Sequence, residues 1–309
     1  MAGSLNDRRR DEPLTIHRPV LLDEVTAFLD VRPDGVYVDA TLGGGGHAQA
    51  VLQRLASGRL LGIDRDPLAL QVARERLQCF GSKATLMQGN FAEIDVLHRA
   101  SGFPLADGVL ADLGLSSMQL ADASRGFSFN VEGPLDMRMD PASETSAADL
   151  VNYSSERELA DLIFKFGEER HSRRIARAIM RARPFRTSTE LAQVVTRAIP
   201  SRPGPHQIHP ATRTFMALRL AVNQELANLE QFLAKVLSVM SPGGRLAVIG
   251  FHSLEDRLVK QSFATWQREG LATILTRKVV RPSEQEAGRN PRSRSAKLRI
   301  AEKTSALRR

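Results

Sequence analysis

Four consecutive glycines, at positions 43–46, follow a short apolar run and precede a helical pattern that begins at Ala48. Glycine tolerates positive φ and lets a backbone approach a ligand closely, so this order predicts a binding site at the helix N-terminus. Gly43, Gly45 and Ala48 also match the dinucleotide pattern G-x-G-x-x-A. Asp64, about 20 residues further on, is placed to accept hydrogen bonds from ribose hydroxyls. The loop by itself leaves a nicotinamide cofactor and an adenosyl cofactor open.

An acid before the glycine loop favours one of these ligands. Asp39 lies four residues before Gly43, where its carboxylate would repel a pyrophosphate. S-Adenosylmethionine carries no phosphate, and its amino-acid tail tolerates or uses an acid. Asn90 and Phe91, after the third apolar run, offer the polar edge contact and the apolar face that an adenine needs. Taken singly, Asp39 could equally be a strand-end cap and Phe91 a core residue.

Asp112 ends the fourth apolar run and therefore points toward the same crevice. Methyl transfer from a sulfonium is an in-line displacement that needs little activation, so the protein must align the nucleophile and handle its proton. The lone pair of an exocyclic base amine is delocalised into the ring, and a carboxylate that accepts its N–H helps to localise that pair. Asp112 is the candidate catalytic residue, with a contact to the cofactor alone as the alternative.

Short apolar runs alternate with helical patterns and predict the strands of one buried, mostly parallel sheet. The runs cover residues 36–41, 59–64, 84–88, 108–112 and 245–251. Between residues 125 and 210 the sequence shows helical and loop patterns without a convincing strand. A long helical pattern then covers residues 211–240. Two β-rich pieces, near 271–280 and 295–301, favour a hairpin at the sheet edge.

This order predicts an α/β fold in which a helical insertion interrupts a sheet that then resumes. We expect a flexible basic N-terminus over 1–12, a discontinuous Rossmann-like domain over 13–124 and 211–309, and an inserted helical substrate-recognition domain over 125–210. A chain of 309 residues, 42% hydrophobic and 25% charged, fits two domains of ordinary size. The same composition excludes a wholly disordered or disulfide-stapled protein.

The sequence carries no signal for secretion or membrane insertion. Its one cysteine, Cys79, cannot form an intramolecular disulfide, and the first 15 residues lack the apolar run of a signal peptide. No stretch approaches the roughly 20 apolar residues of a membrane-spanning helix, so we expect a cytoplasmic protein without a membrane partner. His206 and His209 have a spacing seen in metal sites, but no cysteine or paired acid accompanies them, so we expect no metal.

The formal net charge is +8, and it is concentrated in two segments. Residues 277–309 carry eleven Lys and Arg against three Glu, a net of +8, and residues 165–186 carry eight against two, a net of +6. The rest of the chain must then sum to −6. Such patches are typical of polyanion-binding surfaces, although clusters of one sign also serve solubility.

Arginines recur at helical spacing within residues 165–186. On a helix they fall within an arc of about 100°, opposite Ile175 and Ile179. The stripe consists of Arg170, Arg173, Arg174, Arg177 and Arg181. It would meet RNA phosphates and give affinity without sequence choice, or be only the solvated face of an amphipathic helix. A non-catalytic RNA-binding or assembly protein would use the same patches.

Long motifs along the chain resemble those of one known family. They are HRPVLLDE, DATLGGGGH, GIDRDP, ADLGLSS, RGFSF, GPLDMRMDP, GEER, HPATRTFMALRLAVNQEL, SPGGRLAVIGFHSLEDR and NPRSRSAKLRIAEK. In this order, from His17 to Lys303, they are similar to the family of ribosomal RNA small subunit methyltransferase H, also called MraW.

The resemblance implies a class I, Rossmann-like methyltransferase that uses S-adenosylmethionine to methylate N4 of a cytidine in the decoding region of 16S rRNA. It implies cofactor contacts at Gly45, Gly46, His47, Asp64, Phe91, Asp112 and Gln119. We expect the inserted domain to hold single-stranded RNA, with Arg173, Arg174 and Arg177 as the RNA-binding residues. We also expect the assembled small ribosomal subunit as the substrate, and the sequence leaves open whether the protein is a monomer or a homodimer.

Two further points bear on the reaction. No aromatic follows Asp112 to stack the extruded target base, so we expect Phe127, Phe129 or the FHSLED loop to do so. A nicotinamide reductase would need a proton donor such as Tyr-x-x-x-Lys, and neither tyrosine of the chain has a lysine at that spacing. The sequence therefore disfavours the reductase.

Overall fold

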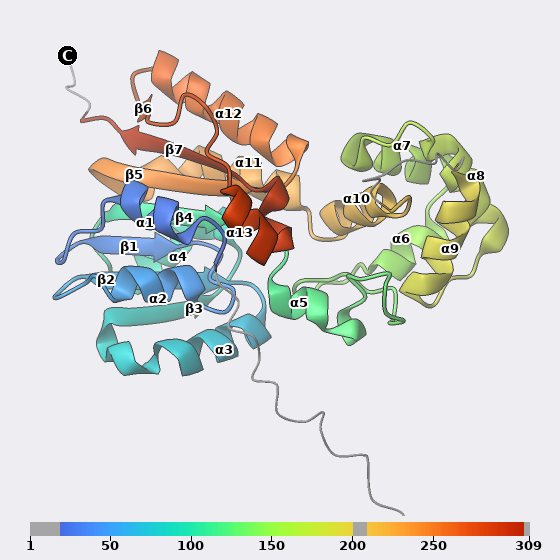
Figure 1. The fold of residues 1–309 in the computed structure, drawn as a ribbon, viewed down its shortest axis with the longest axis horizontal. Coiled ribbons are helices and arrows are strands. Elements are labelled where there is room, and N and C mark those ends of the chain that lie inside the picture. Colours follow the sequence, from blue (N-terminus) through green and yellow to red (C-terminus); the bar gives the residue numbers. More distant parts are fainter. Residues whose placement is uncertain (1–18, 200–208, 306–309) are drawn as a thin grey trace, which may run out of the picture.

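The computed structural model describes residues 19–199 and 209–305, and its strands form one sheet in the order β3-β2-β1-β4-β5-β7-β6 (Figure 1). The strands are β1 (Val36–Asp39), β2 (Arg59–Asp64), β3 (Ala84–Gln88), β4 (Ala106–Asp112), β5 (Met240–Gly250), β6 (Ala272–Ile274) and β7 (Lys297–Lys303). β1 to β5 run parallel, whereas β7 pairs antiparallel with β5 and with β6 at the edge. The predicted mostly parallel α/β sheet is confirmed. The two expected edge strands do pair antiparallel, but a helix over Glu284–Arg289 lies in the connection between them, so they do not form a simple hairpin.

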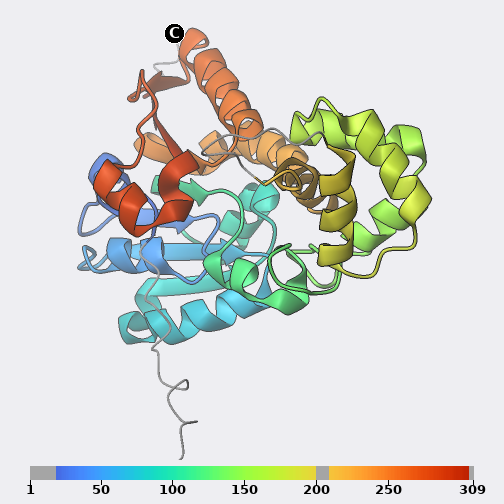
Figure 2. The same ribbon diagram turned by 45° about the vertical axis from the view of Figure 1, so that its right-hand side comes forward.

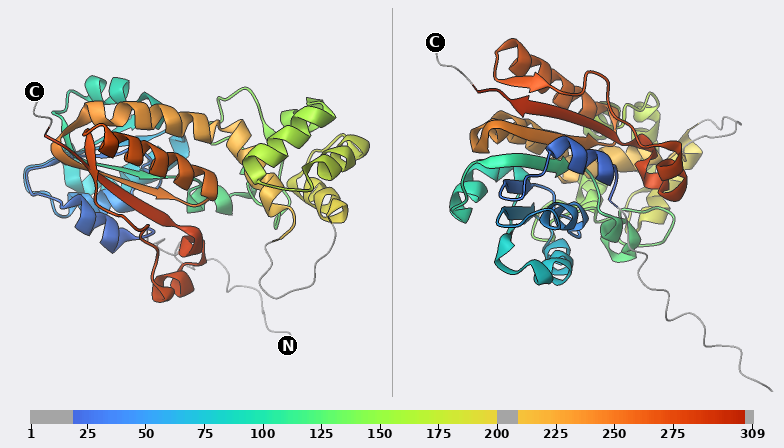
Figure 3. Two further views of the ribbon diagram at one scale, coloured as in Figure 1. Left: turned by 90° about the horizontal axis from the view of Figure 1, so that it is seen from above. Right: turned by 60° about the vertical axis from the view of Figure 1, so that its left-hand side comes forward.

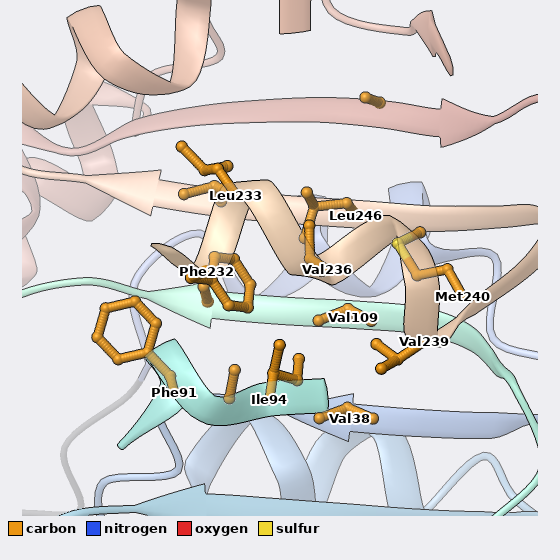
Figure 4. Close-up of a cluster of buried hydrophobic side chains, with 14 of the residues drawn as sticks. Val38, Phe91, Ile94, Val109, Phe232, Leu233, Val236, Val239, Met240 and Leu246 are labelled. Carbon is orange, nitrogen blue, oxygen red and sulfur yellow. The ribbon is translucent and has the colours of Figure 1, made fainter. Parts of the chain in front are cut away.

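Helices cover both faces of this sheet, because alternate strand residues point to opposite faces and both sets are apolar. On one face lie α1 (Leu22–Leu29), α2 (Gly46–Leu52) and α3 (Pro67–Leu77). On the other lie α4 (Ile94–Ser101), α11 (Glu225–Lys235) and α12 (Ser253–Arg268). Figure 4 shows the second face. Phe232 of α11, and Val236 in the short 3-10 helix that follows α11, pack there on Val38, Val109 and Leu246 of the strands.

A helical lobe projects to one side of the sheet domain (Figures 1 and 2). It contains α6 (Ala147–Tyr153), α7 (Glu156–Gly167), α8 (Ser172–Ala182), α9 (Ser188–Ala198) and α10 (Thr212–Val222). Capping boxes at Ser146, Ser155 and Thr187 start three of these helices. The lobe has its own apolar cluster, which continues past residue 210 to Val222 and is separate from the two clusters on the sheet.

The single helix expected over residues 211–240 is wrong. The chain forms α10 and α11 with a break at Asn223 and Gln224, and Gln224 has φ +50°. The Asn223 side chain accepts a hydrogen bond from Met139 N at 2.7 Å and donates to Met137 O at 2.8 Å. These bonds tie the loop before α6 to the junction between the lobe and the sheet domain.

Other expectations meet the structure in part. The stripe of arginines loses one member, because α8 begins at Ser172 and Arg170 lies in the turn before it. The expected flexible segment 1–12 and His206 lie outside the described residues. The remaining short helices are α5 (Ser117–Ala121) and α13 (Glu284–Arg289). In the part of the chain that the structure describes, no helix is both long enough and apolar enough to cross a membrane.

Candidate active site

A cavity opens at the carboxyl ends of the parallel strands, where Asp64 at the end of β2 and Asp112 at the end of β4 line one space. Its lining contains all the expected cofactor contacts except Gly45. These lining residues are Gly46, His47, Asp64, Phe91, Asp112 and Gln119. The strand tips converge because neighbouring parallel strands end at one edge of the sheet, as the sequence analysis assumed.

The glycine loop between β1 and α2 forms one wall of the cavity. Gly45 has φ +76° and precedes the first residue of α2, so it shapes the loop through its backbone conformation. A Cβ at Gly45 would point toward Ala73 and Leu77 of α3, away from the cavity. Gly46 serves a different purpose, since an ideal Cβ there would lie 2.5 Å from Cγ of Pro19. Gly45 therefore belongs to the site as a loop former, whereas Gly46 lines it.

Asp64 at the end of β2 is held in one orientation by two backbone amides. Its Oδ2 accepts from Gly43 N at 2.7 Å, and its Oδ1 accepts from Asp66 N at 2.9 Å. Burial raises the pKa of the Asp64 carboxyl, and the amides of Asp66 and Gly43 lower it in part. Each carboxylate oxygen has a further lone pair, so Asp64 can still accept hydrogen bonds from a ligand in the cavity.

His47 and Asp112 face each other across the cavity wall. His47 Nε2 lies 3.6 Å from Asp112 Oδ2, which is too long for a hydrogen bond. Among the described residues neither ring nitrogen of His47, which is 6% exposed, has a hydrogen-bond partner, and neither does the buried Oδ1 of Asp112. Buried polar atoms are ordinarily hydrogen-bonded, so these atoms fit a ligand that supplies polar partners.

Asp39 lies beneath this pair and does not line the cavity. Burial raises the pKa of Asp39 to about 7, while the nearby His47 and the amide of Thr41 lower it in part. The amide of Thr41 donates to Asp39 Oδ1 at 3.3 Å, so Asp39 acts as a cap at the strand end. The structure thus favours the strand-cap interpretation of Asp39 over a direct contact with the ligand.

Polar and aromatic residues after β3 and β4 complete the wall. Phe91 lines the cavity and packs edge-on against Phe232, with ring centroids 5.3 Å apart. Asn90 instead turns away, since its side chain donates to Asn228 Oδ1 at 3.0 Å, and the expected polar edge contact from Asn90 is wrong. Gln119 donates to Asp66 Oδ2 at 2.8 Å, which places it beside the Asp64 turn.

Several lining residues were missed by the sequence analysis, above all Glu225 and Glu255. Glu225 forms two hydrogen bonds with Arg219, the shorter at 2.8 Å. Glu255 accepts from Phe251 N at 2.8 Å; burial alone would raise its pKa, but the adjacent His252 and Arg219 bring the pKa below its usual value. Glu225 ends the quoted motif HPATRTFMALRLAVNQEL with Leu226, and Glu255 lies in SPGGRLAVIGFHSLEDR, but no local pattern indicates that the two acids meet at one cavity.

The three candidate RNA-binding arginines lie on α8 in the helical lobe and do not line the cavity. All three are exposed, and Arg177 Nε lies 3.4 Å from Glu156 Oε1. The lobe contacts the sheet domain through Glu168, which hydrogen-bonds Ser253 and lies 3.1 Å from Arg257 of α12. The stripe therefore lies on a lobe that is joined to the sheet domain next to the start of α12.

Asp136, His209 and Phe127 have structural roles. Asp136 binds the Arg138 guanidinium at 2.7 and 2.9 Å, which ties down its own loop. His209 stacks on Phe129 with ring centroids 4.6 Å apart, and Phe127 is buried. Of the aromatic groups expected to stack a base, only the FHSLED loop reaches the cavity, through its phenylalanine. Within residues 19–199 and 209–305, no cluster of three His, Cys, Asp or Glu side chains could hold a metal ion.

Comparison with known proteins gives close relatives. The sequence profile of the MraW methylase family matches residues 14–304. Ribosomal RNA small subunit methyltransferase H of Syntrophobacter fumaroxidans is 50% identical over 310 residues, which cover 94% of this chain and 97% of that protein. The protein of the same name in Koribacter versatilis is 53% identical over 296 residues, covering 92% and 93%. Among solved structures, an rRNA methylase from Streptococcus thermophilus aligns with 94% of this chain and 99% of its own, at 13% identity and a TM-score of 0.46.

Proposed function

The chain belongs to the MraW methylase family, and we propose that it transfers the methyl group of S-adenosylmethionine to N4 of a cytidine in the decoding region of 16S rRNA. Relatives that are 50–53% identical are named small-subunit rRNA methyltransferases, and this chain is accordingly an S-adenosylmethionine-dependent methyltransferase of that rRNA. Our proposal adds three details to this activity: that the base is a cytidine, that it lies in the decoding region, and that N4 is the methylated atom.

The cavity offers a complementary group to each part of the methyl donor. When bound, S-adenosylmethionine supplies an electrophilic methyl group on a sulfonium. Asp64 would accept hydrogen bonds from the ribose hydroxyls, and Phe91 would support the adenine face. Gly46 leaves space for Pro19, which also lines the cavity, and the unpartnered ring nitrogens of His47 would meet the polar tail of the methyl donor. Gln119 closes the side of the cavity next to Asp66.

One observation carries the catalytic assignment. Among the carboxylates that line the cavity in the described chain, Asp112 alone accepts no hydrogen bond from the protein. The others are Asp64, Glu225 and Glu255, and each already accepts from an amide or a guanidinium. Asp112 is therefore free to accept an N–H of the target amine, which localises the nitrogen lone pair for attack and stabilises the charge that develops.

The helical lobe supports delivery of the target strand. We place Arg173, Arg174 and Arg177 against phosphates of single-stranded rRNA, because these side chains are exposed on one face of α8. Phe251 at the cavity is the aromatic group that we assign to stacking of the extruded base. A substrate within the assembled small subunit puts the reaction in the cytoplasm. A homodimer is compatible with this assignment but is not required by it.

The decisive experiment uses the full-length protein, isotopically labelled S-adenosylmethionine and small subunits from cells that lack this enzyme. We expect label in rRNA, and mass spectrometry of nuclease fragments should place it on N4 of one cytidine. Free 16S rRNA serves as the matched substrate, and slower labelling of it would support the assembled subunit. Label on a ribosomal protein, or on another base, would contradict the substrate assignment.

A further inference from the structure

Two arginines reach the cavity from segments far apart in the sequence. Arg76 lies in the last turn of α3, and Arg292 lies in the short turn η5 (Pro291–Ser295) that follows α13. Both line the same cavity as Asp112. Neither belongs to the helical lobe or to the set of residues assigned above to the methyl donor.

The Arg76 guanidinium lies over the glycine loop. An ideal Cβ at Gly46 would come within 3.3 Å of Arg76 Nη1, and one at Gly44 within 3.8 Å. Neither Gly44 nor Gly46 has a positive φ, so their backbone conformations do not demand glycine. Their missing side chains instead leave space for Pro19 and for the cationic group above them.

Arg292 is held at the cavity mouth by contacts of its segment. The Oε1 atom of Glu286 in α13 accepts a hydrogen bond from Leu21 N at 2.8 Å, which anchors α13 to the chain just before α1. Pro19 and Val20, next to this anchor, line the cavity as well. Figures 1 and 3 show α13 at the end of the sheet where β7 begins, and the Arg292 side chain is exposed.

The two cations have no anionic partner of their own. Within residues 19–199 and 209–305, neither guanidinium takes part in a hydrogen bond or an ion pair. Arg65, the third arginine of the lining, differs because it donates to Asn223 O at 3.2 Å. The lining acids are likewise used elsewhere or, in the case of Asp112, face His47. Two guanidinium groups that line one cavity without an anionic protein partner are suited to donate charge-assisted hydrogen bonds to an oxyanion.

We propose that Arg76 and Arg292 form a phosphate subsite that holds the backbone of the target nucleotide while its base enters the cavity. This inference rests on the proposed rRNA methylation and adds a second RNA contact to the stripe on α8. Holding a phosphate at the mouth fixes the sugar of the extruded nucleotide, so the amine reaches Asp112 in one orientation. The two arginines act as positioning residues and take no part in proton transfer.

Charge outside the cavity favours an RNA phosphate over the carboxylate of the methyl donor. Arg292 is continuous with a basic surface segment, residues 277–297, which carries seven Lys and Arg against two Glu. A chain of phosphates runs outward over such a segment, whereas a single carboxylate ends inside the cavity. Arg289 and Arg294, on either side of Arg292, are exposed in the same way.

The test compares Arg76→Ala and Arg292→Ala with the unaltered full-length enzyme. We expect KM for small subunits to rise about fivefold to tenfold in each variant, with the dissociation constant of S-adenosylmethionine unchanged within twofold by calorimetry. Because each arginine neutralises one phosphate, the slope of log KM against log salt should fall by about 0.7 per variant. Arg76→Lys and Arg292→Lys should restore most of the slope, since they retain the charge.

Matched controls separate this effect from general loss of charge or of folding. Arg74→Ala removes an exposed cation from the same helix, outside the cavity lining, and should leave KM and the salt slope unchanged. Weaker binding of S-adenosylmethionine with an unchanged salt slope would overturn the proposal and assign the subsite to the donor carboxylate. An unchanged KM and slope in both alanine variants would overturn it as well. Failure of the proposed function is distinct, because the unaltered enzyme would then label no rRNA.

Discussion

The sheet domain and the helical lobe place their polar residues in opposite ways. In the sheet domain, acids and amides that end separate strands gather inside one cavity, because the carboxyl ends of parallel strands meet. In the lobe, amphipathic helices bury their apolar faces on each other, so Arg173 and Arg174 point to solvent. The cavity of the sheet domain thus holds a few charged groups in a region of low dielectric constant. The surface of the lobe holds many charged groups in contact with water.

This difference predicts different kinds of effect. A charge in the buried cavity interacts strongly and individually, so its loss should change one step by a large factor. A charge on the lobe is screened by water and salt, so its loss should change affinity slightly and in proportion to the number of charges removed. Substitutions in the two regions therefore test whether chemistry and affinity are divided between them.

The largest effect should follow Asp112→Asn in the sheet domain. Asparagine keeps the shape of the side chain but removes the negative charge that accepts the amine N–H, so we expect kcat to fall by about 10²- to 10⁴-fold. Binding of S-adenosylmethionine, measured by calorimetry, should change far less. Asp161→Asn, at an acid of α7 whose side chain is 75% exposed, is the control for loss of a carboxylate in the lobe. A kcat within threefold of normal would remove Asp112 from the chemistry.

A second prediction concerns pH and contrasts acids of the two regions. The pKa of Asp39 is about 7 in the folded protein, whereas its ordinary value, which applies to the unfolded chain, is 3.8. Between pH 3.8 and pH 7 the folded state therefore binds more protons at Asp39 than the unfolded state does. The associated stability is fully present below pH 3.8 and is lost as pH rises through 7. From pH 5 to 8 the loss is about 3 kcal/mol.

Urea unfolding at pH 5 and pH 8 measures this term. Asp39→Asn should abolish the loss, because asparagine does not titrate. In the lobe, hydrogen bonds from Ser146 lower the pKa of Asp149, so its contribution is present at both pH values and is lost only in stronger acid. Asp149→Asn should therefore change stability equally at the two pH values. The same loss between pH 5 and 8 in the Asp39→Asn variant would show that another group titrates.

A smaller effect is expected from Asp64→Ala. Removal of a charged acceptor from the ribose site should weaken the binding of S-adenosylmethionine by about 1 to 3 kcal/mol, which raises its dissociation constant roughly 5- to 150-fold. Asp64→Ala also leaves the amides of Gly43 and Asp66 without their acceptor. Asp64→Asn retains one acceptor oxygen and is the matched comparison. Its affinity for S-adenosylmethionine should lie between those of the unaltered enzyme and Asp64→Ala. Unchanged calorimetric affinity in both variants would show that Asp64 does not meet the ribose.

The smallest effects should come from the lobe. Arg173→Ala and Arg174→Ala should each raise KM for small subunits by about twofold to fivefold, in line with exposed charge contacts, and leave kcat and donor binding unchanged. Arg177→Ala should do less, because Glu156 already competes for that guanidinium. A large fall in kcat from any of the three would break the division of roles between the two regions.

Local patterns in the sequence were sufficient for the elements that depend on neighbours along the chain. The alternation of apolar runs and helical stretches predicted the parallel strands, and the glycines after β1 predicted the loop at the start of α2. Contacts between distant segments were not predictable in this way. The break at Asn223 depends on backbone atoms near Met137, and Asn90 turns to Asn228, a residue 138 positions away.

Local order along the chain is enough for the α/β alternation, for the strand ends that carry Asp64 and Asp112, and for the cationic face of α8, because each depends on periodicity or backbone freedom within a few residues. Packing in three dimensions covers Asp39, leaves Asp112 without a hydrogen-bond donor, and brings Arg76 and Arg292 to one cavity. Burial, pairing and charge balance are properties of groups brought together in space. They are set by how the sheet, the lobe and the C-terminal segment pack, which spacing along the chain does not encode.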